Sequence, residues 1–233
     1  MYALVAALAN LLGALAVTHR AARGLKVIEH FVAFGAGFML AVALVEVLPA
    51  AFARSGGAAP VLVLLGYLAV HLTQHTVTPH FHFGEETHAV KPVAGTSALV
   101  GLLLHTFFDG VAIASAFLVG PALGVMVFIA IFLHKLPEGV TIASLMLAAG
   151  QPGGRALQAA GLLGVATLAG VALTDQVGFL VQHGLALSGG VTLYVAASNL
   201  VPEFQGKRGW KLPGAFFAGA AVFFVTKMIL DRA

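Results

Sequence analysis

The chain contains no cysteine and few charged residues. The absence of cysteine excludes disulfides, thiolate metal sites and thiol catalysis, so any bound metal must be held by nitrogen and oxygen atoms. Copper(I), which prefers sulfur ligands, is thereby disfavoured. Lys, Arg, Asp and Glu make up only 9% of the 233 residues, whereas 60% are hydrophobic. This composition is typical of an integral membrane protein.

Several motifs of soluble enzymes and nucleic-acid binders are also missing. The net charge of +3 comes from basic residues in polar loops, where they are read as topology signals, so nucleic-acid binding is not predicted. No Gly-x4-Gly-Lys-Ser/Thr motif is present, so the chain is not expected to hydrolyse ATP. The His-Glu-x-x-His motif of many metallohydrolases is absent as well.

Apolar runs between polar or Gly/Pro breaks predict eight membrane-spanning helices, and hence an all-α membrane protein. The predicted spans are 2–18, 29–53, 60–77, 95–119, 122–149, 156–181, 185–203 and 212–230. No separate soluble domain is evident between them. Residues 1–233 are therefore expected to form a single transmembrane domain.

Basic residues outside the spans predict the orientation of the chain. If the amino terminus lies outside, the outer segments hold Arg54 and Arg232. The inner loops then hold Arg20, Arg23, Lys26, Lys91, Arg155, Lys207, Arg208 and Lys211. An excess of cations on the cytoplasmic side is the usual rule. We therefore expect a multi-pass protein of the cell (inner) membrane with both termini extracytoplasmic.

A repeated His-x3-carboxylate motif is the main functional signal. His105-Thr-Phe-Phe-Asp109-Gly-Val-Ala-Ile-Ala-Ser returns 29 positions later as His134-Lys-Leu-Pro-Glu138-Gly-Val-Thr-Ile-Ala-Ser. In each copy the His and the carboxylate project from one face of a helix. Ionisable groups in a bilayer cost roughly 2.5–3.5 kcal/mol each on insertion scales and normally face a bundle interior. Two imidazoles and two carboxylates suit a borderline dication such as Zn²⁺ or Fe²⁺.

The spacing of the motifs raises one geometric difficulty. If two straight helices are joined near Gly120, His105 and His134 lie at nearly the same depth. Asp109 and Glu138 then differ by seven residues, or about 10 Å of helical rise. A tilt or a kink must close that gap, and Pro137, which lacks an N–H, is the candidate cause.

These residues resemble the ZIP (Zrt/Irt-like) family of divalent metal transporters, whose fourth and fifth spans carry His-Asn-x-x-Glu-Gly or close variants. The ending Asn199-Leu-Val-Pro-Glu203 of the seventh span and the eight-span ZIP-like bundle are similar to that family as well. The resemblance implies uptake of zinc, or of iron, manganese or cadmium, toward the cytoplasm. It also implies a homodimer and one bundle that moves against a more static one. Its primary metal site matches His105, Asp109, His134 and Glu138.

The sequence departs from the two-metal members of this family directly after the motif histidines. Thr106 and Lys135 stand where those members place further ligands. A protonated lysine cannot bind a metal, yet it can neutralise a neighbouring carboxylate where a second ion would lie. A single-metal site is therefore expected, unless Lys135 turns away toward water.

Other polar residues are candidates for the ion pathway or for a second site. Glu46 and Asp175 are predicted within the hydrocarbon zone, where each is a candidate relay ligand or proton acceptor. Glu46-Val-Leu-Pro and Asn199-Leu-Val-Pro both place a polar group three residues before a proline, which suggests pseudo-symmetry. Glu203 lies near a span end, where solvation at the interface explains it equally well. The full set of these candidates is Glu46, Thr106, Lys135, Asp175, Asn199 and Glu203.

The segment at about 78–92, between the third and fourth spans, is rich in histidine and lies on the predicted cytoplasmic side. Its His80, His82 and His88 are candidates for collecting metal weakly. A polar linker that happens to contain histidine accounts for the same pattern.

Three functions remain open from the sequence alone. A carrier or selective permease would take the dication as its transported substrate, with no permanent cofactor and no enzymatic activity. Its expected partners are the ion, the lipid bilayer and a second copy of the chain, and not nucleic acid. An intramembrane metallohydrolase would need an open coordination position and a general base, whereas both motif carboxylates are committed as ligands. A proton-conducting or metal-sensing membrane protein could use the same groups without net metal flux.

Overall fold

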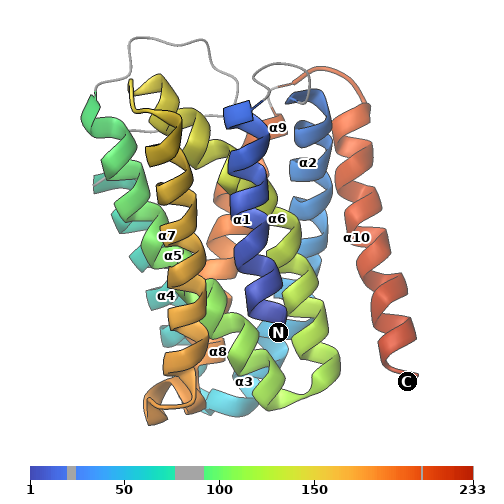
Figure 1. Ribbon diagram of the computed structural model, residues 1–233. Coiled ribbons are helices and arrows are strands. Elements are labelled where there is room, and N and C mark those ends of the chain that lie inside the picture. Colours follow the sequence, from blue (N-terminus) through green and yellow to red (C-terminus); the bar gives the residue numbers. More distant parts are fainter. Residues whose placement is uncertain (20–24, 77–91, 206, 233) are drawn as a thin grey trace.

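The computed structural model describes residues 1–19, 25–76, 92–205 and 207–232, which form a bundle of helices (Figure 1). Its long helices are α1 (Tyr2–His19), α2 (Leu25–Val42), α4 (Ala59–Thr76), α5 (Pro92–Val119), α6 (Pro121–Ala148), α7 (Gly153–Thr174), α8 (Gly178–Tyr194) and α10 (Lys211–Leu230). Shorter elements are η1 (Ala43–Val47), α3 (Leu48–Ser55), η2 (Gly56–Ala58), η3 (Val195–Leu200) and α9 (Pro202–Gln205). Every regular element in the described residues is helical, which confirms the predicted all-α class.

Seven continuous helical stretches in the described residues are long and apolar enough to span a membrane. The longest, Ile28–Thr76, has 49 residues and contains two of the predicted spans. The chain turns back at Gly56, whose φ of 54° lies in the left-handed region that favours glycine. Counting that stretch as two crossings brings the bundle into agreement with the predicted ZIP-like arrangement.

Helices α1, α5, α6 and α7 form a group that we call the motif bundle, because α5 and α6 carry the repeated motif. Glycines bring its backbones into contact in two helix pairs. A Cβ at Gly139 of α6 would overlap the backbone carbonyl of Asn10 in α1, and a Cβ at Gly110 of α5 would overlap that of Thr167 in α7. Such close approach through small residues is how membrane helices gain packing contact without a hydrophobic driving force.

Helices α2, α4, α8 and α10 form a second group, the flanking bundle, built in the same way. Gly37 of α2 lies against the backbone of Phe216 in α10, and Gly66 of α4 lies against the backbone of α8. The two bundles meet where α5 packs on α8 and α2 packs on α6. At the second contact a Cβ on Gly35 would lie 3.5 Å from the Cβ of Leu133, an ordinary van der Waals distance. At this contact, therefore, the helices lie farther apart than at the glycine contacts within each bundle.

Two π-helical turns, η1 and η3, occupy corresponding places in the flanking bundle. η1 continues α2 and precedes Pro49, whereas η3 continues α8 and precedes Pro202. Proline removes a backbone donor and its ring crowds the carbonyl four residues earlier, and the wider π turn accommodates both effects. The N–H of Leu48 and that of Val201 each donate to the carbonyl five residues back. The polar-x-x-Pro pattern thus has the same local structure in both places.

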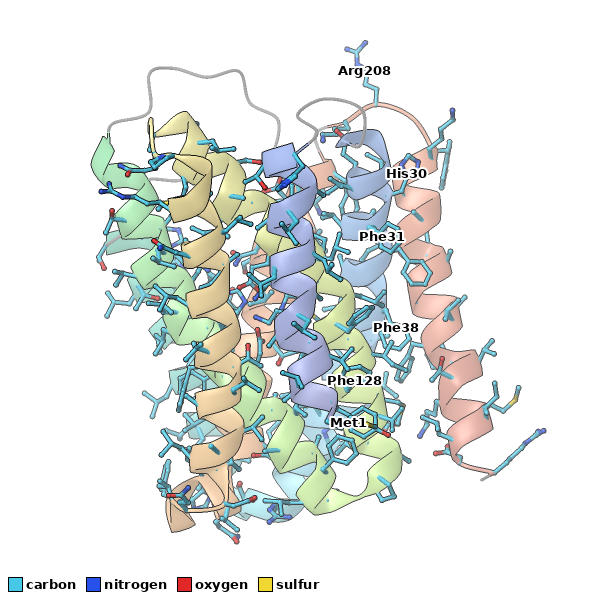
Figure 2. The ribbon with its side chains drawn as sticks, in the orientation of Figure 1. Met1, His30, Phe31, Phe38, Phe128 and Arg208 are labelled. Atoms are coloured by element: carbon cyan, nitrogen blue, oxygen red, sulfur yellow. The ribbon has the colours of Figure 1, made fainter. Side chains whose placement is uncertain are left out.

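The two ends of the molecule differ in charge. Both chain termini lie toward one end, together with Arg54 and Arg232 (Figure 1). The opposite end, at the top of Figure 1, is called the basic end below, and Figure 2 shows Arg208 extending from it. Its described basic residues include Lys26, Arg155, Lys207, Arg208 and Lys211.

Candidate metal centre

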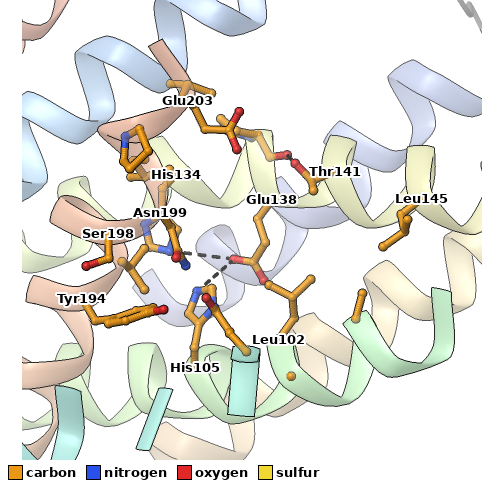
Figure 3. A pocket seen from close by; sticks show the side chains of 18 of the residues that line it. Leu102, His105, His134, Glu138, Thr141, Leu145, Tyr194, Ser198, Asn199 and Glu203 are labelled. Atoms are coloured by element: carbon orange, nitrogen blue, oxygen red, sulfur yellow. Dashed lines mark hydrogen bonds and ion pairs between the residues drawn. The ribbon is translucent and has the colours of Figure 1, made fainter. Parts of the chain in front are cut away.

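The two His-x3-carboxylate motifs meet in the bundle interior. One ligand atom from each of four residues lies within 4.8 Å of the other three. Nε2 of His134 lies 3.3 Å from Oδ2 of Asp109 and 3.8 Å from Oε2 of Glu138. Nε2 of His105 lies 3.4 Å and 3.6 Å from the same two oxygens. All four side chains are buried. Figure 3 marks the contacts of Glu138 with both imidazoles by dashed lines.

The direction in which helical side chains lean reduces the expected mismatch in depth between the carboxylates. α5 and α6 are joined at Gly120 and run in opposite directions (Figure 1). A helical side chain leans toward the amino terminus of its own helix. Asp109 lies nearer to the α5–α6 turn and leans away from it, whereas Glu138 lies farther from that turn and leans toward it. The two carboxylates therefore converge.

His134 is oriented as a metal-binding histidine. Its Nδ1 lies 3.2 Å from the carbonyl oxygen of Ala130 and donates to it, because a carbonyl can only accept. In the neutral ring this leaves the lone pair on Nε2, which faces the oxygens of Asp109 and Glu138. Lone pairs that face one another repel unless a cation lies between them. A backbone carbonyl that sets the tautomer in this way is the usual outer partner of a metal-bound imidazole.

Lys135 turns toward the site and is fully buried. Its Nζ lies 2.6 Å from Oδ2 of Asp109 and 2.7 Å from Oε2 of Glu138. A third contact, at 3.3 Å, reaches Oγ1 of Thr106. The three donors of the ammonium thus have three acceptors.

The net charge of the centre favours the binding of one dication over two. Two carboxylates and one ammonium sum to −1 when both imidazoles are neutral. A single dication is still attracted to this set and meets four N and O donors that suit zinc. A second dication close to the same carboxylates would meet the ammonium of Lys135.

A cavity of about 540 Å³ extends from the centre toward the basic end, and Figure 3 shows residues that line it. Its inner part is lined by His105, His134 and Glu138. Farther out it is lined by residues from the last turn of α4, the start of α5, η3 and α9. These include Gln74, His75, Ala98, Ser198, Asn199 and Glu203.

On the other side of the centre, α5 and α8 pack closely. Val111, Ile113 and Leu185 are buried there. Arg54 of α3 donates to the carbonyl of Val181 in α8 at 2.9 and 3.1 Å, and to that of Leu118 in α5 at 3.4 Å. These contacts join both bundles at the end opposite to the basic end.

Some of the predicted pathway residues lie at the cavity or the centre, and others lie away from both. Asn199 and Glu203 line the cavity, as noted, and Thr106 and Lys135 contact the centre. Glu46, in contrast, is not among the cavity residues and pairs with Lys227 of α10, the Nζ and Oε1 atoms being 2.5 Å apart. His80, His82 and His88, with nearly all of the predicted 78–92 loop, lie outside the described residues.

Asp175 does not lie inside a span. Helix α7 ends at Thr174 rather than near residue 181, and Asp175 is its exposed C-terminal cap. The prediction erred because the apolar residues of the first turn of α8 extend the hydrophobic run across a turn at Asp175-Gln176-Val177. Continuous hydropathy cannot separate two helices joined in this way.

A polar and aromatic wall on the flanking bundle was not predicted. Tyr194 of α8 lines the cavity beside His75 of α4. Its ring lies 4.9 Å from that of Tyr67, whose hydroxyl is 2.9 Å from that of Ser198. Tyr67, His71 and His75 are four residues apart along one helix face, and this spacing was the available signal.

A helical membrane bundle with buried, converging imidazoles and carboxylates defines a protein that can bind a cation within the membrane. A family model described as ZIP zinc transporter matches residues 85–227, which include both motifs, α7, α8 and most of α10. The chain therefore belongs to the ZIP zinc transporter family, as the motifs predicted. Membership implies divalent metal transport across a membrane rather than an enzymatic activity. No curated protein matches the chain.

Proposed function

We propose that this protein carries zinc across the cell membrane toward the cytoplasm, with His105, Asp109, His134 and Glu138 as the ligands during passage. The convergence of these four buried ligand atoms within 4.8 Å, at the inner end of a cavity, is the observation that carries the proposal. The transport domain comprises residues 1–233, and the homodimer implied by the family resemblance is part of the same proposal.

The donor set supports zinc as the main substrate. Two imidazole nitrogens and two carboxylate oxygens match the N and O ligands of four-coordinate zinc. Iron, manganese and cadmium are secondary substrates of the same site, because first-row dications bind N/O ligands in an order set largely by the metal. The contacts of Lys135 with both carboxylates support one ion at a time.

The distribution of charge and the opening of the cavity support the direction of transport. The basic end carries the cations that are normally retained in the cytoplasm, so we assign it to that side, which leaves both termini outside. The cavity leads from the centre toward this end, and Arg54 joins the two bundles at the other. This arrangement is the cytoplasm-facing stage of a cycle in which the motif bundle moves against the flanking bundle.

Metal flux into liposomes tests the proposal. Purified protein is reconstituted into liposomes that contain a zinc-sensitive dye, and zinc is added to the outer solution. The proposal expects saturable zinc entry that is lost in Glu138→Gln and kept in Glu29→Gln, a control that removes a carboxylate paired with Lys207 outside the centre. Proton flux or metal binding without metal entry would instead favour the proton-conducting or metal-sensing alternative.

A further inference from the structure

The hydroxyl of Thr106 binds one of the two carboxylate oxygens of Glu138. Oγ1 of Thr106 lies 2.7 Å from Oε1 of Glu138 and donates to it, because a carboxylate oxygen can only accept. The other oxygen, Oε2, is the one that faces the imidazoles of His105 and His134. The two oxygens of this carboxylate therefore have different partners.

The bond is part of a closed set of buried contacts. Thr106 is fully buried, and its hydroxyl has a single proton, which it gives to Glu138. The same hydroxyl oxygen accepts from Nζ of Lys135 at 3.3 Å. Lys135 in turn contacts Oε2 of Glu138 at 2.7 Å. Both oxygens of Glu138 are thus tethered, and rotation of the carboxylate would break two buried hydrogen bonds at once.

We propose that Thr106 is a specificity-determining residue, which limits Glu138 to one coordinating oxygen and so favours a small four-coordinate dication over a larger one. This inference rests on the proposed function. Zinc is satisfied by one oxygen from each carboxylate. Larger dications prefer more ligands and often take both oxygens of a carboxylate. A tether on Oε1 withholds the additional oxygen that a larger ion would use.

The proposed role requires a hydroxyl group on the residue that follows the motif histidine His105. A valine in place of Thr106 keeps the shape of the side chain but has no hydroxyl, so Oε1 of Glu138 loses its donor while it remains buried. An unpaired buried carboxylate oxygen gains most by binding the ion itself. A serine keeps the hydroxyl and therefore keeps the tether.

Competition between cadmium and zinc for the purified, metal-free protein tests the proposal. We expect Thr106→Val to shift the ratio of the two affinities toward cadmium by roughly tenfold, the scale on which outer-shell partners act on a metal site. Thr106→Ser should leave the ratio within about twofold of the parent. Thr141→Val is the matched control, because the hydroxyl of Thr141 lines the cavity but donates to the carbonyl of Pro137 in its own helix.

X-ray absorption at the cadmium edge provides a second readout that does not depend on transport. One additional oxygen neighbour should appear in Thr106→Val and not in Thr106→Ser. If the valine variant does not fold, Thr106→Ala removes the same hydroxyl with less bulk. An unchanged cadmium-to-zinc ratio in a folded variant that lacks the hydroxyl would overturn the inference, as would equal weakening of both ions. Failure of the parent protein to bind either ion would instead count against the proposed function.

Discussion

Lys135 and Asp109 form a buried ion pair, with Nζ 2.6 Å from Oδ2. The same Oδ2 is the oxygen that lies closest to the imidazole of His134. A fixed ammonium therefore shares the ligand oxygen that a bound dication would use. In the low-dielectric interior each uncompensated charge would cost several kcal/mol. The ammonium of Lys135 compensates the charge of the two neighbouring carboxylates, as a second metal ion would otherwise do.

Replacement of this lysine should open a second metal position. In Lys135→Asn the ammonium is lost and an amide oxygen appears next to Asp109 and Glu138, so the carboxylates would attract a second dication. We expect the zinc stoichiometry of the purified protein to rise from one to two, with a second anomalous peak in crystals soaked with metal.

The control for that stoichiometry is Lys227→Asn. Lys227 pairs with Glu46 and Asp231 and does not line the cavity. One metal should remain in this variant. Two metals in the parent protein would show that Lys135 does not occupy the second position.

Loss of one ligand carboxylate should be severe. Asp109→Asn leaves a buried dication and the ammonium of Lys135 with one remaining negative charge, and breaking such a buried pair costs about 3–5 kcal/mol. The zinc Kd should rise by roughly two to four orders of magnitude. Titration calorimetry measures this change, and Glu29→Gln should bind zinc as the parent does. Parental affinity in Asp109→Asn would remove Asp109 from the ligand set.

Acidification should weaken zinc binding. Both imidazoles must be neutral to act as ligands, so protons compete with the ion as the pH falls. Each imidazole that must lose a proton on metal binding lowers the affinity by up to about tenfold per unit of pH. Calorimetry in buffers of different ionisation enthalpy counts the released protons. A count of zero at every pH at which zinc still binds would argue against ligation by histidine.

The glycine contacts within the motif bundle should be sensitive to added bulk. A methyl group at Gly110 would overlap the backbone of Thr167, which cannot move aside as a side chain can. We expect Gly110→Ala to lower the stability by about 1–3 kcal/mol, seen as a lower melting temperature in detergent. Gly214→Ala is the control, because the space around that glycine is open. Equal melting temperatures for the two variants would contradict the close packing of α5 and α7.

The absence of cysteine offers a direct test of access to the cavity. Leu102→Cys places a single thiol in the cavity wall, and Ser115→Cys places one in the buried region beside α8. In membranes of known orientation, a charged thiol reagent should modify the cysteine at 102 from the cytoplasmic side and leave the one at 115 unmodified. Faster modification at 102 from the outer side would reverse the assigned direction of opening.

The features that could be predicted from the sequence are those with local physical causes. Hydrophobic runs of sufficient length require membrane helices, and four-residue spacing requires that His105 and Asp109 share a helix face. Because that pair recurs as His134 and Glu138, the second half of the centre could be predicted as well. These predictions needed no knowledge of how the helices pack.

The remaining features depend on contacts between residues far apart in the chain. Glu46 and Asp175 looked alike as acids in apolar runs, yet the first pairs with Lys227 across a helix contact and the second caps a helix in an exposed turn. The lean of the side chains on antiparallel helices brought the motif carboxylates together, and packing turned Lys135 inward toward them. Only the tertiary structure decided these points, because hydropathy and spacing describe one helix at a time, whereas the partner of a buried charge is set by which helices lie against each other.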